Sequence, residues 1–258
     1  MPVIETYAPG TFCWAELGTP DPAAAKRFYT SLFGWTAEDR PIGPDEFYTM
    51  LHRKGRSVGA LYRQDPAQQG APSHWLSYIS VASANDATRR AKELGGTALM
   101  DPFDVLDVGR MAMVQDPTGA VVALWEPRRH AGAEIVGEPG SMCWNELATT
   151  DPTRAGAFYT SLLGWTAESH PMATTSYTMF TDQGAPRGGM MTLLPSWGAV
   201  PHWLVYFAVS DIEGQTALAQ SLGGSVRVPP AEAPGVGRFS VLADPQGAAF
   251  AAIELLPA

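Results

Sequence analysis

The chain has 258 residues, of which 45% are hydrophobic and 17% charged, which is typical of a globular protein with one large domain or two ordinary ones. Its formal net charge of −9 and its lack of any Lys/Arg run argue against nucleic acid or an anionic membrane as a partner. No apolar stretch reaches the length of a membrane-spanning helix and the N-terminus lacks a signal-peptide pattern, so we expect a cytoplasmic protein.

The first predicted element is the short apolar run FCWAEL, which is typical of a β-strand. A helix is expected next, because Asp21 is a favourable N-cap, Pro22 suits the first turn and Gly34 suits the end. Its apolar side chains fall on one face: Ala25, Phe28, Tyr29 and Leu32. Three strands should follow, around Trp35 and over 48–52 and 57–62.

The same order of elements recurs from residue 74 onward. HWLSYISV is typical of a strand, and SANDATRRAKELGG of a helix closed by two glycines. Three short strands follow as far as Trp125, with DPTG as the turn between the last two. This half of the chain therefore consists of two βαβββ units.

The whole pattern occurs a second time. CWAELGTPDPAAAKRFYTSLFGWTAED, residues 13–39, is matched by CWNELATTDPTRAGAFYTSLLGWTAES, residues 143–169, and later motifs match as well. A repeat of this length is a domain rather than a solenoid unit. We predict a first domain over 1–127, a linker over 128–140 and a second domain over 141–258, paired within the chain, as a monomer or homodimer. Cys13 and Cys143 occupy matching positions and should be free, buried thiols.

The motifs DPAAAKRFYTSLFGW, SANDATRRAKELGG and DPTGAVVALWEP resemble the two helices and final hairpin of the vicinal oxygen chelate superfamily. That superfamily includes glyoxalase I, bleomycin-resistance proteins and extradiol dioxygenases, and the chain is most similar to two-domain actinobacterial hydroxylase-like or glyoxalase-like members. The resemblance implies an α+β fold in which tandem βαβββ units form two cup-shaped domains. In metal-dependent members, His, Gln or Glu side chains on the concave face hold a divalent ion.

The positions that the resemblance assigns to these ligands carry no suitable donor here. They are Trp14, Leu76, Ala123 and the stretch from Gly59 to Leu61, with Trp144, Leu204, Ala251 and the stretch near Gly189 in the second copy. Since Zn²⁺, Fe²⁺ and Mn²⁺ need N, O or S donors, we expect no metal and no other cofactor. A shifted His/Glu set that binds a metal is the alternative.

Alternation along the strands predicts which side chains face each cup. Glu16 and Glu146 should point inward, while Cys13, Ala15 and Leu17 pack on the helix. A buried carboxylate needs a partner. Each glutamate is therefore either a structural group bonded to the backbone, a Tyr or a His, or a ligand anchor or general base with a raised pKa.

Two histidines open strands near the mouths of the cups and are either structural or part of a proton transfer with the glutamates. The candidate catalytic residues are thus Glu16, Glu146, His74 and His202. The candidate ligand-binding residues, assigned by the same alternation, are Trp14, Tyr48, Met50, Tyr78, Trp144, Tyr177, Met179 and Tyr206. Glu126 and Glu254 have the opposite parity and should lie on the outer face or at a strand end.

Cups lined in this way favour a flat, apolar or aromatic small molecule. The first hypothesis is metal-independent binding or sequestration of a small hydrophobic or aromatic metabolite, including an antibiotic or a reactive compound. The second is a glyoxalase-like lyase, isomerase or hydroxylase that uses a cup Glu or His as base. The third is an interaction module whose cups are filled by its own side chains.

Overall fold

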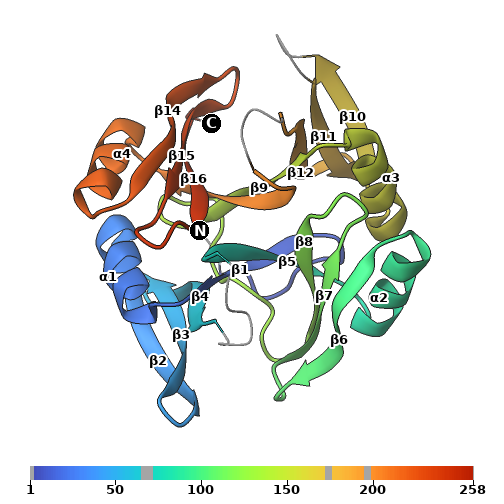
Figure 1. The fold of residues 1–258 in the computed structure, drawn as a ribbon, viewed down its shortest axis with the longest axis horizontal. Coiled ribbons are helices and arrows are strands. Elements are labelled where there is room, and N and C mark those ends of the chain that lie inside the picture. Colours follow the sequence, from blue (N-terminus) through green and yellow to red (C-terminus); the bar gives the residue numbers. More distant parts are fainter. Residues whose placement is uncertain (1–2, 65–71, 172–175, 195–198, 258) are drawn as a thin grey trace.

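The computed structural model describes residues 3–64, 72–171, 176–194 and 199–257 (Figure 1). Within these ranges the chain forms two eight-stranded sheets and four helices. The elements of the first sheet are β1 (Phe12–Thr19), α1 (Pro22–Phe33), β2 (Thr36–Gly43), β3 (Glu46–Arg53), β4 (Arg56–Arg63), β5 (His74–Ser80), α2 (Ala84–Glu93), β6 (Thr97–Val105), β7 (Gly109–Gln115) and β8 (Val121–Pro127).

The second sheet and its two helices repeat this order of elements. They are β9 (Met142–Thr149), α3 (Pro152–Leu163), β10 (Thr166–Pro171), β11 (Ser176–Asp182), β12 (Ala185–Thr192), β13 (His202–Val209), α4 (Ile212–Ser221), β14 (Ser225–Ala233), β15 (Gly237–Ala243) and β16 (Ala249–Leu255). The predicted α+β fold with tandem βαβββ units is confirmed.

Local chemistry sets the helix boundaries. The Asp21 carboxylate accepts a hydrogen bond from the Ala24 amide at 3.0 Å, and Gly34 ends α1 in the left-handed conformation at φ 66°. Asp151 caps α3 in the same way. On the outer face, Glu126 and Glu254 accept hydrogen bonds from the first amides of α2 and α4, as their strand parity predicts.

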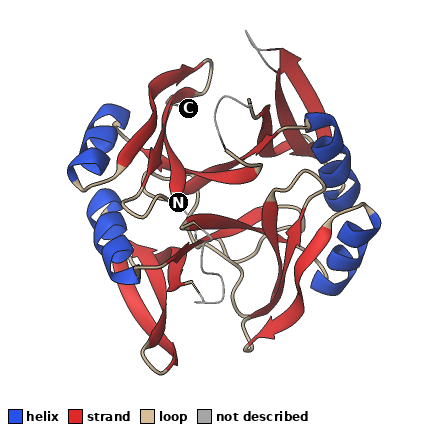
Figure 2. Ribbon diagram, in the orientation of Figure 1, coloured by secondary structure: helices blue, strands red, loops and turns tan. Residues whose placement is uncertain are grey.

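Each sheet joins its two βαβββ units through their first strands. The order is β2-β3-β4-β1-β5-β8-β7-β6 in the first sheet and β10-β11-β12-β9-β13-β16-β15-β14 in the second. β1 pairs antiparallel with β5 and parallel with β4, and β9 pairs in the same way with β13 and β12. Figure 2 shows the helices on the two sides of the molecule, with both sheets between them.

The two domains pack back to back, and their helices pair across the boundary. α1 lies against α4, and α2 lies against α3 (Figure 1). One buried core includes Tyr29 and Trp75 of the first domain and Phe207 and Phe250 of the second. The predicted pairing of the domains within one chain is therefore confirmed, and the cup faces point away from this shared core.

One predicted orientation is wrong. Ala15 and Leu17 lie in the shared core as expected, but Cys13 packs on the cup side together with Trp14. The reason is a β-bulge, because the register between β1 and β5 shifts between Phe12 and Trp14. Both cysteines are free thiols, with Cys13 buried and Cys143 half-buried.

Among the described residues, no helix has the length and apolar character needed to cross a membrane.

Candidate functional site

The floor of the first cup holds a buried glutamate between two tyrosines. Glu16 on β1 is 8% exposed, and its Oε1 accepts a hydrogen bond from the Tyr78 hydroxyl of β5 at 2.5 Å. Its Oε2 accepts from the Tyr48 hydroxyl of β3 at 2.9 Å. The indole Nε1 of Trp14 donates to the same Tyr48 oxygen at 3.3 Å. Strand pairing brings these four groups together, as the predicted facing requires.

The second cup repeats the arrangement. Glu146 on β9 is also 8% exposed, and its Oε1 accepts from the Tyr206 hydroxyl at 2.9 Å. Tyr177 donates to the same carboxylate and accepts from the Trp144 indole at 3.0 Å. Gly189 makes room for this bond, because a Cβ at that position would overlap the Tyr177 hydroxyl.

Burial controls the acid–base state of both groups. It raises the pKa of Glu16 and Glu146, while the tyrosine hydrogen bonds lower it in part. Burial and the neighbouring carboxylate also raise the pKa of Tyr48, Tyr78 and Tyr206 well above the ordinary value. The tyrosines therefore stay neutral donors, and each glutamate is a preorganised acceptor with the pKa direction of a general base.

The two candidate histidines lie at the strand ends, bonded to nearby loops. The Nδ1 atom of His74 lies 2.9 Å from the Pro72 carbonyl oxygen, and that of His202 lies 2.8 Å from the Val200 carbonyl oxygen. In the described part of the chain, neither histidine hydrogen-bonds to a cup glutamate. A joint role in proton transfer therefore stays a prediction.

The candidate ligand-binding residues differ in exposure between the cups. In the first cup Trp14, Met50 and Tyr78 are buried, with Trp14 only 3% exposed. In the second cup Tyr206 is buried, but Trp144 is half-buried. Tyr48, Tyr177 and Met179 are half-buried as well.

Sequence reasoning missed the part played by the predicted linker. The Ala133 amide donates to the Cys13 carbonyl at 2.8 Å, and the Tyr7 hydroxyl donates to the Ala133 carbonyl at 2.6 Å. The ring of His130 packs edge-on against Trp14, with centroids 4.6 Å apart. Within 128–140, the run AEIV has three apolar residues out of four, which is the sequence signal that this segment packs on the protein.

The residues at the family's metal positions do not fit a divalent ion. Glu16 lies opposite Ala60 on β4 and Leu76 on β5, and Ala123 lies opposite Tyr78. Each cup thus offers one carboxylate, which already accepts tyrosine hydrogen bonds, at both oxygens in Glu16 and at Oε1 in Glu146. Over the described residues, no group of three or more His, Cys, Asp or Glu side chains is placed to hold a metal ion.

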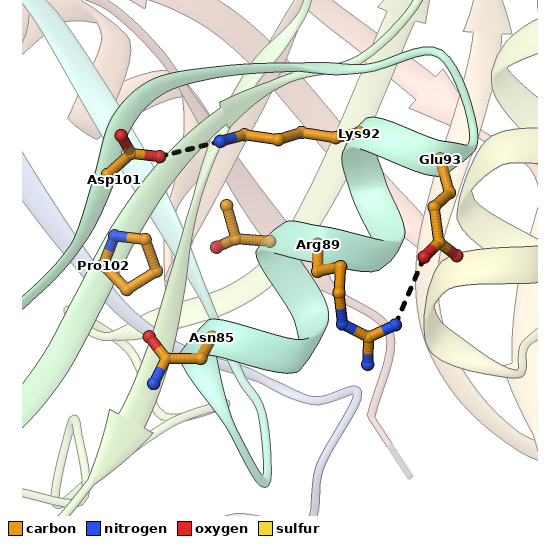
Figure 3. A pocket seen from close by; sticks show the side chains of 7 residues that line it. Asn85, Arg89, Lys92, Glu93, Asp101 and Pro102 are labelled. Carbon is orange, nitrogen blue, oxygen red and sulfur yellow. Dashed lines mark hydrogen bonds and ion pairs between the residues drawn. The ribbon is translucent and has the colours of Figure 1, made fainter.

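A surface groove of about 360 Å³ lies outside both cups, between α2 and β6 (Figure 3). Its charged side chains pair with one another: Lys92 contacts Asp101 at 2.8 Å, and Arg89 contacts Glu93 at 3.2 Å. Arg110 likewise pairs with Asp104 on the surface. The groove's charges are therefore already satisfied, and the cups remain the better candidate site.

Solved structures of the same fold cover almost the whole chain. A Mn(II)-bound glyoxalase from Novosphingobium aromaticivorans aligns with a TM-score of 0.67 at 16% identity, covering 96% of this chain and 83% of that one. The 2,3-dioxygenase LapB from Pseudomonas sp. KL28 aligns with a TM-score of 0.66 at 11% identity, covering 97% and 93%. At these identities the likeness shows the fold alone.

Two relatives are closer in sequence. The Mycobacterium tuberculosis protein named "Putative glyoxylase CFP32" is 42% identical over 261 residues, covering 100% of this chain and 99% of its own. The anthracycline biosynthesis protein DnrV of Streptomyces peucetius is 37% identical, covering 96% of this chain and 94% of its own.

Family profiles match each domain separately. The profile of the Glyoxalase/Bleomycin resistance protein/Dioxygenase superfamily matches residues 11–124, and that of the Glyoxalase-like domain matches residues 142–253. The fold, the full-length relatives and both profiles agree, so the chain belongs to the glyoxalase/bleomycin resistance protein/dioxygenase superfamily, with two tandem domains.

Proposed function

We propose that this protein binds a small, flat, hydrophobic or aromatic metabolite in a cup without using a metal. One observation carries the proposal: in both cups a buried glutamate lies between two tyrosines and beside a tryptophan. Trp, Leu and Ala stand where the superfamily's metal ligands are expected. The chemistry of the cup is therefore that of an aromatic surface with one oriented hydrogen-bond acceptor.

Two terms would hold such a ligand. Burial of apolar surface contributes roughly 25 cal/mol per Å², and ring packing against an indole adds about 0.5–1.5 kcal/mol. A cup glutamate that already accepts tyrosine hydroxyls keeps lone pairs for a hydrogen bond from the ligand. Because the carboxylate is fixed before binding, it orients the ligand at little entropic cost.

The names of the relatives support an aromatic ligand. DnrV and DauV are named as anthracycline biosynthesis proteins, and anthracyclines are polycyclic aromatic compounds. We favour binding that sequesters such a compound and so gives resistance to an antibiotic or a reactive compound.

A second candidate is a glyoxalase-like lyase or isomerase, or a hydroxylase. The raised pKa of both cup glutamates favours it, because a carboxylate with a raised pKa is a stronger base. The name of the mycobacterial relative points the same way. In this case Glu16 or Glu146 would take a proton from the bound substrate.

Calorimetric titration of EDTA-dialysed protein with 2-naphthol, before and after addition of Mn²⁺, Zn²⁺ or Fe²⁺, tests the proposal. We expect saturable binding with the same affinity in every case. Binding that appears only with a metal would refute the proposal. A parallel activity assay with the glutathione hemithioacetal of methylglyoxal tests the second candidate. Turnover that is abolished by Glu16→Gln and Glu146→Gln would favour an enzyme.

A further inference from the structure

The two cups are not equally accessible, although their floors match. Cys13, Trp14 and Met50 are buried in the first cup, whereas their counterparts Cys143, Trp144 and Met179 are half-buried in the second. Phe239 of the second cup is half-buried too, while its counterpart Met111 is buried. Two floors with the same Glu–Tyr–Trp arrangement are therefore buried in the first cup and only half-buried in the second.

The cover of the first cup is the segment 128–136, with His130 as its aromatic group. The His130 ring meets Trp14 at an interplanar angle of 89°, and the Trp125 indole donates to the His130 carbonyl at 2.9 Å. Burial lowers the pKa of His130, which keeps its imidazole neutral. Within the described residues, no aromatic ring packs on Trp144 in this way.

The first cup thus shows which group fits above the matched floor. The His130 imidazole that occupies the first cup is a flat, neutral heteroaromatic ring that carries an N–H. Trp144 is half-buried, and among the described residues no ring covers it, so a second aromatic ring that packed on its accessible face would lower the free energy.

The charged groups around Glu146 narrow the chemical class of the ligand further. Glu146 accepts hydrogen bonds from Tyr206 and Tyr177, and no described Lys, Arg or His forms an ion pair with it. Arg187, on the strand that pairs with β9, binds Asp182 through Nη2 at 2.9 Å, while its buried Nε has no hydrogen-bond partner among the described residues. A ligand carboxylate would therefore meet a carboxyl group without a compensating base, whereas an O–H or N–H donor would meet a free lone pair.

We infer that the second cup is the binding site, and that it takes one flat aromatic molecule per chain bearing an O–H or N–H donor and no negative charge. The first cup is occupied by the chain's own His130. This inference rests on the proposed function and deepens it, since it names the cup, the stoichiometry and the ligand class.

Three matched probes test the ligand class on the full EDTA-dialysed chain. They are 2-naphthol, 2-methoxynaphthalene and 2-naphthoate, which share one ring system but differ in donor and charge. We expect one equivalent of 2-naphthol to bind at least 10-fold more tightly than either of the others, because a hydrogen bond to a carboxylate is lost in both. Equal or tighter binding of 2-naphthoate would overturn the ligand class.

Paired substitutions test the location. Trp144→Leu and Glu146→Gln should each weaken 2-naphthol binding at least 10-fold, whereas the matched changes Trp14→Leu and Glu16→Gln should alter it less than 2-fold. Equal effects in both cups, or two bound equivalents, would overturn the inference but leave the proposed function standing. Absence of binding by all three probes would overturn both.

A second readout does not depend on the stability of variants. In protein labelled with 5-fluorotryptophan, the ¹⁹F resonance of Trp144 should shift on titration with 2-naphthol while that of Trp14 stays in place. A shift of the Trp14 resonance alone would place the ligand in the first cup and refute the assignment.

Discussion

The two cup glutamates differ from most buried charges because each lies between two phenolic hydroxyls. Tyr48 and Tyr78 hold Glu16, and Tyr206 and Tyr177 hold Glu146. Such an arrangement compensates for desolvation only in part, and the pKa of each carboxyl therefore rises. The inward facing of both glutamates follows from strand alternation, but their tyrosine partners come from strands distant in sequence.

This raised pKa predicts a specific pH dependence of stability. Below the ordinary pKa of 4.5 the carboxyls are protonated in both the folded and the unfolded state, and their stabilisation of the folded state is fully present. This stabilisation is lost as pH rises through the raised pKa of the folded state. The variant Glu16→Gln/Glu146→Gln should therefore gain stability relative to the parent above pH 4.5. We expect about 1.4 kcal/mol for each unit of raised pKa.

Urea unfolding of the parent and of this double variant at several pH values between 4 and 8 measures the difference. The other titrating groups are common to both proteins, so their contributions cancel in the difference between the two free energies of unfolding. A difference that stays constant with pH would show that the folded-state pKa is not raised.

At the scale of elements, the segment predicted as a linker also closes the first cup. Its Glu134 carboxylate accepts hydrogen bonds from the Ser57 amide at 2.7 Å and hydroxyl at 3.1 Å. Gly132 allows the close approach to β1: it has φ 139°, and a Cβ at that position would overlap the Cys13 carbonyl oxygen. The fold brings the backbone of Gly132 against that of Cys13, and this close approach explains why a glycine is needed there.

Gly132→Ala should consequently destabilise the protein by about 3 kcal/mol, through backbone strain and displacement of the segment from β1. Gly137→Ala is the matched control in the same segment, since Gly137 also has a positive φ of 76° but an added Cβ would meet no atom within 4 Å. The control should cost only about 1 kcal/mol. Denaturant unfolding measures both, and equal losses would contradict the close approach.

For the whole molecule, the shared core makes the two domains depend on each other. Tyr29 of α1 donates to Asp244 of the second domain at 3.2 Å and accepts from the Trp75 indole at 2.9 Å. Tyr159 of α3 is buried, which raises its pKa, and lies close enough to Asp116 of the first domain for that carboxylate to raise its pKa further; it accepts a hydrogen bond from the Trp203 indole at 2.8 Å. The two domains should therefore unfold together.

Scanning calorimetry of Tyr29→Phe and Tyr159→Phe tests this coupling. Each change leaves an indole N–H without its acceptor, so each should lower the free energy of unfolding by about 1–3 kcal/mol. Both should shift the same single transition to lower temperature. Two separate transitions, with each variant affecting only one, would show that the domains unfold independently.

Much of this protein follows from short-range chemistry. The caps at Asp21 and Asp151, the helix ends at Gly34 and Gly164 and the alternation along the strands are read from neighbouring residues, so the four βαβββ units and the inward glutamates could be predicted. The doubled motifs also implied matching cups.

The rest depended on contacts between residues far apart in the chain. The bulge at Cys13, the tyrosines around each glutamate and the ring of His130 over Trp14 arise from long-range packing, which no local pattern encodes. Two nearly identical motifs therefore acquired different accessibility, because only the tertiary structure places residues 128–136 across the first cup and leaves Trp144 half-exposed in the second.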